Sequence, residues 1–328
     1  MLGIDESLKK QLQETNKKLI AKYKSAAGPS RDELRRLIDG QVGRIRPLRK
    51  MSPTELQAWI QGKSIVAVDG SVNQIGGTFP HYLAIIQAVA KGTRAGEVII
   101  RSEIYAPLLE NAAADRDSTG EPDREGRIRT RKMARLEMEA AKEAIAAFNP
   151  RLVMMDGSLI HYRIEDAAAW SELSAFAAAS GTLLVGVTEE IGTQIVSTAL
   201  REALPENMRD FHDRELLFGL LEYGESLEIE TGKGREAAGL RTCFLRPSAD
   251  PQAVGVDILK GQVAEMPDAA DFLFTLTPAA GRGVPVWLDI IDSEVRLTDT
   301  MVEGLVDAYL DADLKQRLFV PKRNSRIF

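Results

Sequence analysis

The chain has 328 residues, of which 44% are hydrophobic and 27% charged, as is ordinary for a globular protein with a large core. Its formal net charge of −6 argues against a broadly basic nucleic-acid coat, but it permits a local basic groove beside an acidic site. Cys243 is the only cysteine, which excludes an intramolecular disulfide and a cysteine-based zinc site. No signal-peptide pattern and no apolar run of about 20 residues is present, so we expect a cytoplasmic protein without membrane spans.

The first 60 residues favour helices, and we interpret residues 1–60 as an N-terminal helical region. Residues 5–25 are polar with a thin apolar stripe, and a second helical stretch covers 31–40. Ser52, Pro53 and Glu55 have the residue types and spacing of a capping box with proline at the first helical position, which predicts a third helix.

Three strands are predicted next. The run SIVAVDG (64–70) is apolar and ends in Asp-Gly, which indicates a buried strand and its exit turn. Residues 81–90 and 97–105 have the same character, with glycine-containing turns between the strands. Short connections favour an antiparallel meander, and the polar segment 110–130 is predicted to be a loop.

A long helix is predicted at 128–148, stopped by Asn149-Pro150. A strand (151–157), a helix (164–179), a strand (182–187) and a helix (190–203) follow. This order predicts an α/β fold, a ribonuclease-H-like mixed sheet flanked by helices. Residues 205–285 are predicted to be an insertion or a β-rich extension of the sheet. Its expected strands, together with one at its end, are 227–230, 240–246, 271–277 and 284–290, and a C-terminal helix is expected at 298–316.

Two predicted strands end in the same motif, Asp-Gly-Ser. Asp69 closes the first strand and Asp156 closes the fourth. The first and fourth strands of a ribonuclease-H-like sheet are neighbours, so the two carboxylates are expected to lie close together. Repulsion between them, and the cost of burying them, would be relieved by a divalent cation. The alternative is that each Asp-Gly pair is only a strand-exit turn.

Glu137 provides a third acid, since it lies on the predicted helix in line with Met133, Ala141 and Ala144. An unpaired carboxylate in such an apolar stripe is costly, so either a salt bridge or a metal ion should neutralise it. Carboxylate oxygens suit Mg²⁺ or Mn²⁺, and three of them fit a two-metal phosphodiesterase site. We therefore predict that Asp69, Glu137 and Asp156 are catalytic metal ligands.

The segments VAVDGS, RLEMEA and RLVMMDGSL resemble the NurA nuclease domain family, in the order and spacing of these three acids. The resemblance implies that residues 61–328 form a NurA-like nuclease domain. It also implies manganese-dependent 5′–3′ exonuclease and endonuclease activity on DNA, a homodimer, and a HerA-type hexameric ATPase partner in DNA end resection.

The chain departs from the family pattern at two places. The family commonly has a lysine and a serine after its fifth strand, where this chain has Glu189 and Glu190. The family also places a histidine or an acid on the C-terminal helix, and here Asp307 and Asp311, one helical turn apart, are the candidates for a fourth metal ligand. A solvated acidic face is the alternative interpretation of these two residues.

Two other functions are compatible with the sequence. An actin-like ATPase shares the core fold. It requires two duplicated halves with glycine-rich phosphate loops, and the sequence shows only one such half, which argues against this function. A catalytically inactive adaptor of a DNA translocase would keep the fold and lose the chemistry, consistent with the missing lysine.

Overall fold

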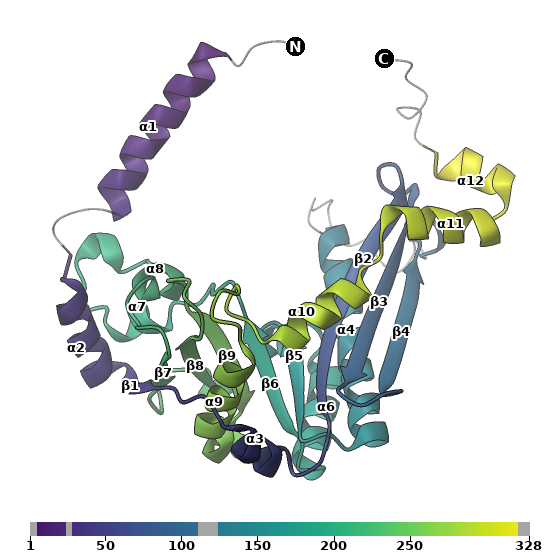
Figure 1. Cartoon of the computed structure of the whole chain (residues 1–328). Coiled ribbons are helices and arrows are strands. Elements are labelled where there is room, and N and C mark those ends of the chain that lie inside the picture. Colours follow the sequence, from purple (N-terminus) through teal and green to yellow (C-terminus); the bar gives the residue numbers. More distant parts are fainter. Residues whose placement is uncertain (1–4, 24–27, 111–123, 321–328) are drawn as a thin grey trace.

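The computed structural model describes residues 5–23, 28–110 and 124–320, and its centre is a nine-stranded mixed sheet (Figure 1). The strand order is β1-β7-β8-β9-β6-β5-β2-β3-β4. Only the β2–β5 and β5–β6 pairs are parallel among these described strands. The strands are β1 (Gly43–Pro47), β2 (Ile65–Gly76), β3 (Tyr82–Gly92), β4 (Val98–Tyr105), β5 (Leu152–Asp156), β6 (Leu183–Thr188), β7 (Glu225–Ile229), β8 (Leu240–Arg246) and β9 (Val254–Leu259).

Twelve described α-helices accompany the sheet. They are α1 (Glu6–Tyr23), α2 (Arg31–Gln41), α3 (Pro53–Ile60), α4 (Arg124–Phe148), α5 (Leu159–Glu165), α6 (Ala167–Ala179), α7 (Ile195–Ala199), α8 (Asp213–Leu217), α9 (Met266–Leu276), α10 (Val286–Val295), α11 (Asp299–Tyr309) and α12 (Ala312–Leu318). Short 3₁₀ turns occur at Pro107–Leu109, Glu206–Met208, Glu236–Ala238 and Lys260–Glu265.

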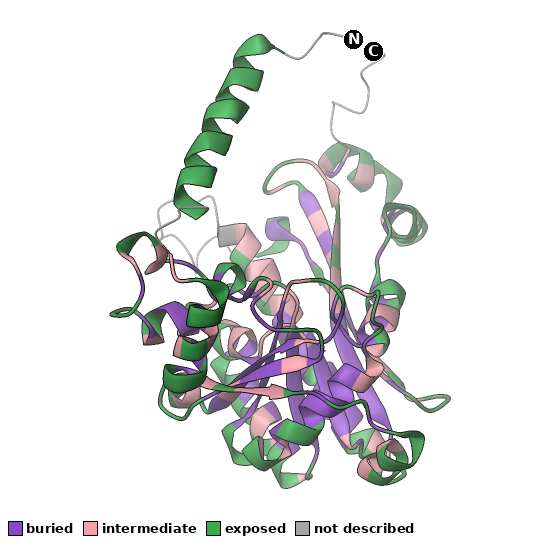
Figure 2. Cartoon of the chain, turned by 60° about the vertical axis from the view of Figure 1, so that its left-hand side comes forward, coloured by how far each residue is buried: buried purple, intermediate pink, exposed green. Residues whose placement is uncertain are grey.

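Helices cover both faces of the sheet, and Figure 2 shows the buried residues concentrated in the strands between them. One face packs against α3, α9 and α10, where Phe272 and Leu288 are fully buried. The opposite face packs against α4, α5 and α6, and the β7–β8 end packs against α2, α7 and α8. Because residues along a strand alternate between faces, each buried strand residue belongs to one of these two layers.

The predicted ribonuclease-H-like fold class is confirmed, as is the antiparallel β2–β3–β4 meander. The described residues form one sheet and not two duplicated halves, which removes the support for the actin-like alternative. The strand predicted at 240–246 matches β8, and β7, β8 and β9 extend the sheet as expected of the 205–285 segment.

The strands predicted at 271–277 and 284–290 are wrong, since these residues lie in α9 and α10. Seven of the eleven residues of α9 are buried. A short apolar run can therefore form a helix that is buried on most sides as readily as a buried strand. The hydrophobic periodicity of such a run does not distinguish the helix from the strand. The strands β1 and β9 were not predicted from the sequence.

The described part of residues 1–60 is mainly helical, with β1 as an edge strand that pairs with β7. The capping box at α3 is confirmed, because Ser52 and Glu55 exchange side-chain to backbone hydrogen bonds, and Pro53 is the first helical residue. α1 buries no residue, and Figure 2 shows it exposed along its length. Most of the predicted loop 110–130 (residues 111–123) lies outside the described residues.

Two predicted helices are shorter than expected. Of residues 190–203, only Ile195–Ala199 are α-helical. The C-terminal helix begins at the predicted cap, Thr298, whose side chain accepts a hydrogen bond from the Met301 amide. It ends at Tyr309, and Asp311 then caps a separate helix, α12.

Candidate metal centre

Asp69 and Asp156 lie side by side where β2 and β5 separate. The last residue pair of these parallel strands is Val68 with Met155, so each aspartate is the next residue along its strand. Asp156 is the final residue of β5, as predicted. Asp69 is not at a strand exit, because β2 continues to Gly76 in antiparallel pairing with β3. The exit-turn interpretation is therefore wrong for Asp69.

Both aspartates are held in surroundings that oppose their ionisation. Burial and the charge of Asp156 raise the pKa of Asp69 to about 7, although the Gly70 amide donates a 2.7 Å hydrogen bond to its carboxylate. Burial raises the pKa of Asp156 to about 6, against the opposing effect of Arg282. Within the described residues neither aspartate forms a salt bridge, because Arg282, the cation that acts on both, is paired with Glu189 and Asp289.

Glu137 approaches β2 from α4, next to Gly70, and is only 6% exposed. Burial raises its pKa to about 8, with further contributions from Asp69 and Asp156, while a hydrogen bond with the Tyr162 hydroxyl lowers it. The hydroxyl of the fully buried Tyr162 also lies 3.2 Å from the backbone carbonyl of Asp156, so its single proton is shared between two acceptors. The salt bridge that would have explained Glu137 does not occur among the described residues.

Gly70 explains how Glu137 can approach β2. Neighbouring residues of a strand point to opposite faces, so Asp69 and α4 lie on different sides of the sheet. A Cβ atom at Gly70 would collide with the Glu137 carboxylate and would lie 2.8 Å from Cγ and 2.9 Å from Sδ of Met133. The absence of a side chain at residue 70 therefore leaves the space that the Glu137 carboxylate occupies.

Replacing Gly70 by alanine is expected to displace Glu137 and to lower metal-dependent activity about 100-fold, comparable to the loss of one well-placed catalytic group. Activity assays and Mn²⁺ titration would measure the effect. Gly192, whose added Cβ would meet no atom within 4 Å, is the matched control. A Gly70→Ala protein that binds Mn²⁺ and retains wild-type activity would contradict this role of Gly70.

Four charged residues from distant segments complete the surroundings. Asp292 of α10 acts on both Asp69 and Asp156, raising their pKa values, and Glu189 and Asp289 act on Asp156. Arg282 opposes them. Asp289, Asp292 and Arg282 were not predicted as site residues from the sequence. The sequence indicated only the two aspartates, through their Asp-x-x-Asp spacing. This spacing places both acids on one face only if the segment is a helix.

The serines of the two Asp-Gly-Ser motifs have supporting roles. Ser71 Oγ accepts a 3.1 Å hydrogen bond from the Leu297 amide, and the Asn73 side chain donates to the Leu297 carbonyl at 2.8 Å. These bonds attach the end of α10 to β2 beside the site. Ser158 Oγ donates to buried Asp257 at 2.7 Å, which also pairs with Arg235.

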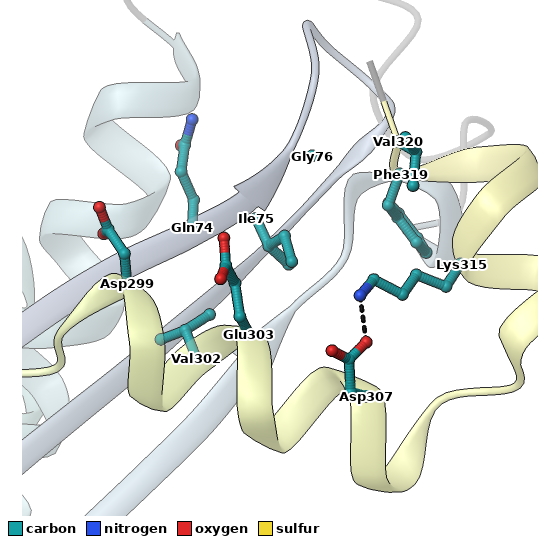
Figure 3. A pocket seen from close by; sticks show the side chains of 10 residues that line it. All are labelled: Gln74, Ile75, Gly76, Asp299, Val302, Glu303, Asp307, Lys315, Phe319 and Val320. Atoms are coloured by element: carbon teal, nitrogen blue, oxygen red, sulfur yellow. Dashed lines mark hydrogen bonds and ion pairs between the residues drawn. The ribbon is translucent and has the colours of Figure 1, made fainter. Parts of the chain in front are cut away.

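Asp307 and Asp311 are not brought to this site. Asp307 lines a separate pocket of about 480 Å³ with Gln74, Ile75 and Gly76, and it pairs with Lys315 (Figure 3). Gln74 is five residues beyond Asp69, which is roughly 17 Å along a strand. Asp311 caps α12 by accepting hydrogen bonds from two backbone amides. The prediction that the two acids lie one turn apart on the same helix is wrong, because α11 ends between them.

The chemistry of the donor set fits a hard divalent cation: it offers only oxygen atoms, and its negative charge is not balanced. Across residues 5–23, 28–110 and 124–320, however, no three His, Cys, Asp or Glu side chains are grouped to hold an ion as they stand.

The mixed sheet, with parallel β2, β5 and β6 at its centre and helices on both faces, gives the chain a ribonuclease-H-like fold. A family model described as NurA domain matches residues 63–297. The chain therefore belongs to the NurA family, as the sequence resemblance implied, and this membership supports a nuclease.

Solved structures agree with the fold. "Crystal structure of NurA bound to dAMP and manganese" is 11% identical with a TM-score of 0.56, and the match covers 95% of this chain and 99% of that one. "Crystal structure of NurA with manganese" is 13% identical with a TM-score of 0.53, covering 93% and 99%. "Crystal structure of NurA" is 10% identical with a TM-score of 0.54, covering 94% and 99%. None of the curated proteins matches the chain.

No helix of the described residues is both long enough and apolar enough to cross a membrane.

Proposed function

We propose that this chain is a divalent-metal-dependent deoxyribonuclease in which Asp69, Glu137 and Asp156 hold Mn²⁺ or Mg²⁺. The proposal rests on three carboxylates near the point where β2 and β5 separate: Asp69 and Asp156 on adjacent strands, and Glu137 against Gly70. Burial raises the pKa values of Asp69, Glu137 and Asp156 to about 7, 8 and 6, and none of the three has a salt-bridge partner among the described residues. Such an arrangement costs folding free energy unless a ligand uses it. The NurA structures with manganese support the choice of ion.

A bound divalent cation would supply a water of lowered pKa and would stabilise the departing oxygen. Asp69 and Asp156 offer oxygens from one face of the sheet, and Glu137 offers oxygens through the space beside Gly70. The water oxygen forms a new bond to phosphorus, one P–O ester bond breaks, and a phosphate end and a hydroxyl end result. Since the acids are not grouped around one point, their side chains would have to rotate to hold a cation together.

We infer that Asp292 is the fourth acid of this centre, in place of Asp307 or Asp311. It lies on α10 and acts electrostatically on Asp69 and on Asp156. Asp307 instead faces Lys315 in the separate pocket (Figure 3).

Asp292→Asn is expected to lower cleavage about 100-fold, whereas Asp307→Asn should leave cleavage unchanged. The assay uses labelled single- and double-stranded DNA with Mn²⁺, with Mg²⁺, or with EDTA. The reverse pattern, loss in Asp307→Asn and none in Asp292→Asn, would restore the ligand assignment made from sequence. Wild-type protein that cuts neither DNA with either ion would overturn the nuclease proposal, and DNA-independent binding to a translocase would then favour the inactive adaptor.

The more specific properties of the protein are proposed from its membership of the NurA family. We propose 5′–3′ exonuclease and endonuclease activity in DNA end resection, a homodimer, a HerA-type hexameric ATPase partner and a cytoplasmic location. Light scattering after gel filtration tests the homodimer, and co-elution with a HerA-type ATPase tests the partner.

A further inference from the structure

Arg282 joins three segments at the edge of the carboxylate site. It lies between α9 and α10, and its Nε donates to Asp289 in the first turn of α10 at 2.8 Å. Its Nη1 donates to Glu189, which follows β6, at 2.7 Å. The guanidinium is thus fixed from two sides by carboxylates that are far apart in the sequence.

The charge of Arg282 acts on the centre of the site. It lowers the pKa of both Asp69 and Asp156, against burial and the surrounding acids. Among the described residues it is the cation that acts on both aspartates. A phosphodiester is an anion, and its approach to so many carboxylates requires positive charge on the protein side as well as from bound cations.

The guanidinium keeps donors for a ligand. Arginine has five N–H groups in a planar fork that matches phosphate oxygens, and the two bonds to protein use Nε and Nη1. In the described part of the chain, Nη2 has no hydrogen-bond partner, and the side chain is 42% exposed. Because the two carboxylates already hold the group in place, little side-chain freedom remains to be lost when it binds a ligand.

We propose that Arg282 binds a non-bridging oxygen of the DNA phosphate at the carboxylate site, with Glu189 and Asp289 as positioning residues. The inference rests on the proposed nuclease function for its substrate, but the contact itself is measurable without cleavage.

The test compares Arg282→Gln, Arg282→Lys, and Arg282→Gln combined with Glu189→Lys. Since the Glu189 carboxylate lies 2.7 Å from Nη1, a lysine at residue 189 would return a cation to nearly the same place. Arg31→Gln is the matched control. Arg31 is the first residue of α2, its side chain is 44% exposed, and it is paired with one carboxylate, that of Glu222. Binding of labelled single-stranded DNA is measured across a salt series with Ca²⁺, cleavage with Mn²⁺, and Mn²⁺ affinity by calorimetry without DNA.

Arg282→Gln is expected to reduce the slope of log affinity against log salt by about 0.7, the value for one phosphate contact on a single strand. It should also lower the turnover number about 100-fold and leave Mn²⁺ affinity equal or higher. Arg282→Lys should fall between this variant and wild type, and Glu189→Lys should recover part of the salt slope. Arg31→Gln should resemble wild type in all three measurements.

An unchanged salt slope in Arg282→Gln overturns the inference, whatever happens to cleavage. Loss of Mn²⁺ affinity together with thermal stability, without recovery by Glu189→Lys, also overturns it, because that result describes a structural arginine. If wild-type protein fails to cut DNA with any ion, the proposed function fails by itself, while the salt slope still decides whether Arg282 contacts phosphate.

Discussion

Replacing Asp69 by asparagine is expected to lower metal-dependent DNA cleavage by about a thousandfold and, at the same time, to raise the unfolding temperature of the metal-free protein. Removing a buried residue usually destabilises a fold. Asp69 should behave in the opposite way, because the residue is only 8% exposed, is repelled by the charge of Asp156, and has no salt-bridge partner among the described residues.

The physical reason is that the charged form of Asp69 is costly without a cation. Asparagine has nearly the same shape and carries no charge, so it removes both the burial cost and the repulsion from Asp156. It keeps an oxygen that can accept the 2.7 Å hydrogen bond from the Gly70 amide. The metal-free fold gains stability, and the ion loses a ligand.

Thermal unfolding with EDTA and with Mn²⁺, together with the cleavage assay, measures both effects. Asp307→Asn serves as the control, since its carboxylate is 61% exposed and paired with Lys315. A protein that loses activity and also unfolds at a lower temperature in EDTA would show that the Asp69 carboxylate stabilises the fold even without a bound ion.

In metal-free protein the free energy of unfolding is expected to fall as pH rises from about 4 to about 8. The pKa values of Asp69, Asp156 and Glu137 in the folded chain, about 7, 6 and 8, lie above the ordinary values of 3.8 and 4.5. Between the ordinary and the raised values the folded state binds more protons than the unfolded state. The stability contribution is therefore complete below about pH 4 and is lost as pH rises through the raised values.

Each carboxyl that titrates in this window contributes a slope of about 1.4 kcal/mol per pH unit, and mutual repulsion spreads the three steps. Mn²⁺ should cancel the loss, because metal binding releases the protons and provides the missing positive charge. The stabilisation by Mn²⁺ is thus expected to increase from pH 5 to pH 8.

Urea unfolding at several pH values, with EDTA or Mn²⁺, tests this expectation. Glu137→Gln should flatten the upper part of the EDTA curve, since the group with the highest of the three values is removed. An EDTA curve that stays level or rises over this range would mean that the three carboxylates are ionised in the metal-free fold without cost.

The juxtaposition of Asp69 and Asp156 could be predicted from the sequence because it depends on local motifs and one rule of sheet order. Each aspartate follows an apolar run, and the runs pair in parallel as far as Val68 and Met155. The burial of Glu137 could also be predicted from the sequence, since it depends only on the helical periodicity of the apolar residues around it.

The other side of the site could not be predicted, because it depends on tertiary packing. Residues 284–290 are apolar enough to be predicted as a strand, and that error hid Asp289 and Asp292 on one helix. The contact between Glu189 and Arg282 spans 93 residues, and no local pattern indicates it. Asp307 and Asp311 looked equivalent only while the C-terminal helix was taken to be continuous.

α1 differs from the other long helices in the interactions that stabilise it. This helix of 18 residues buries no side chain, and its last residue, Tyr23, packs its ring against Phe211. The rest of the helix depends mainly on its own backbone hydrogen bonds, which are only marginally stable in water. Its amide protons should therefore exchange with deuterium far faster than those of β2 or α4, which are held by the cores on both faces of the sheet. Any molecule that covers Leu12 or Leu19, both at least half exposed, would slow that exchange. Residues 6–23 thus provide a built-in reporter of association, readable by mass spectrometry before any partner is known.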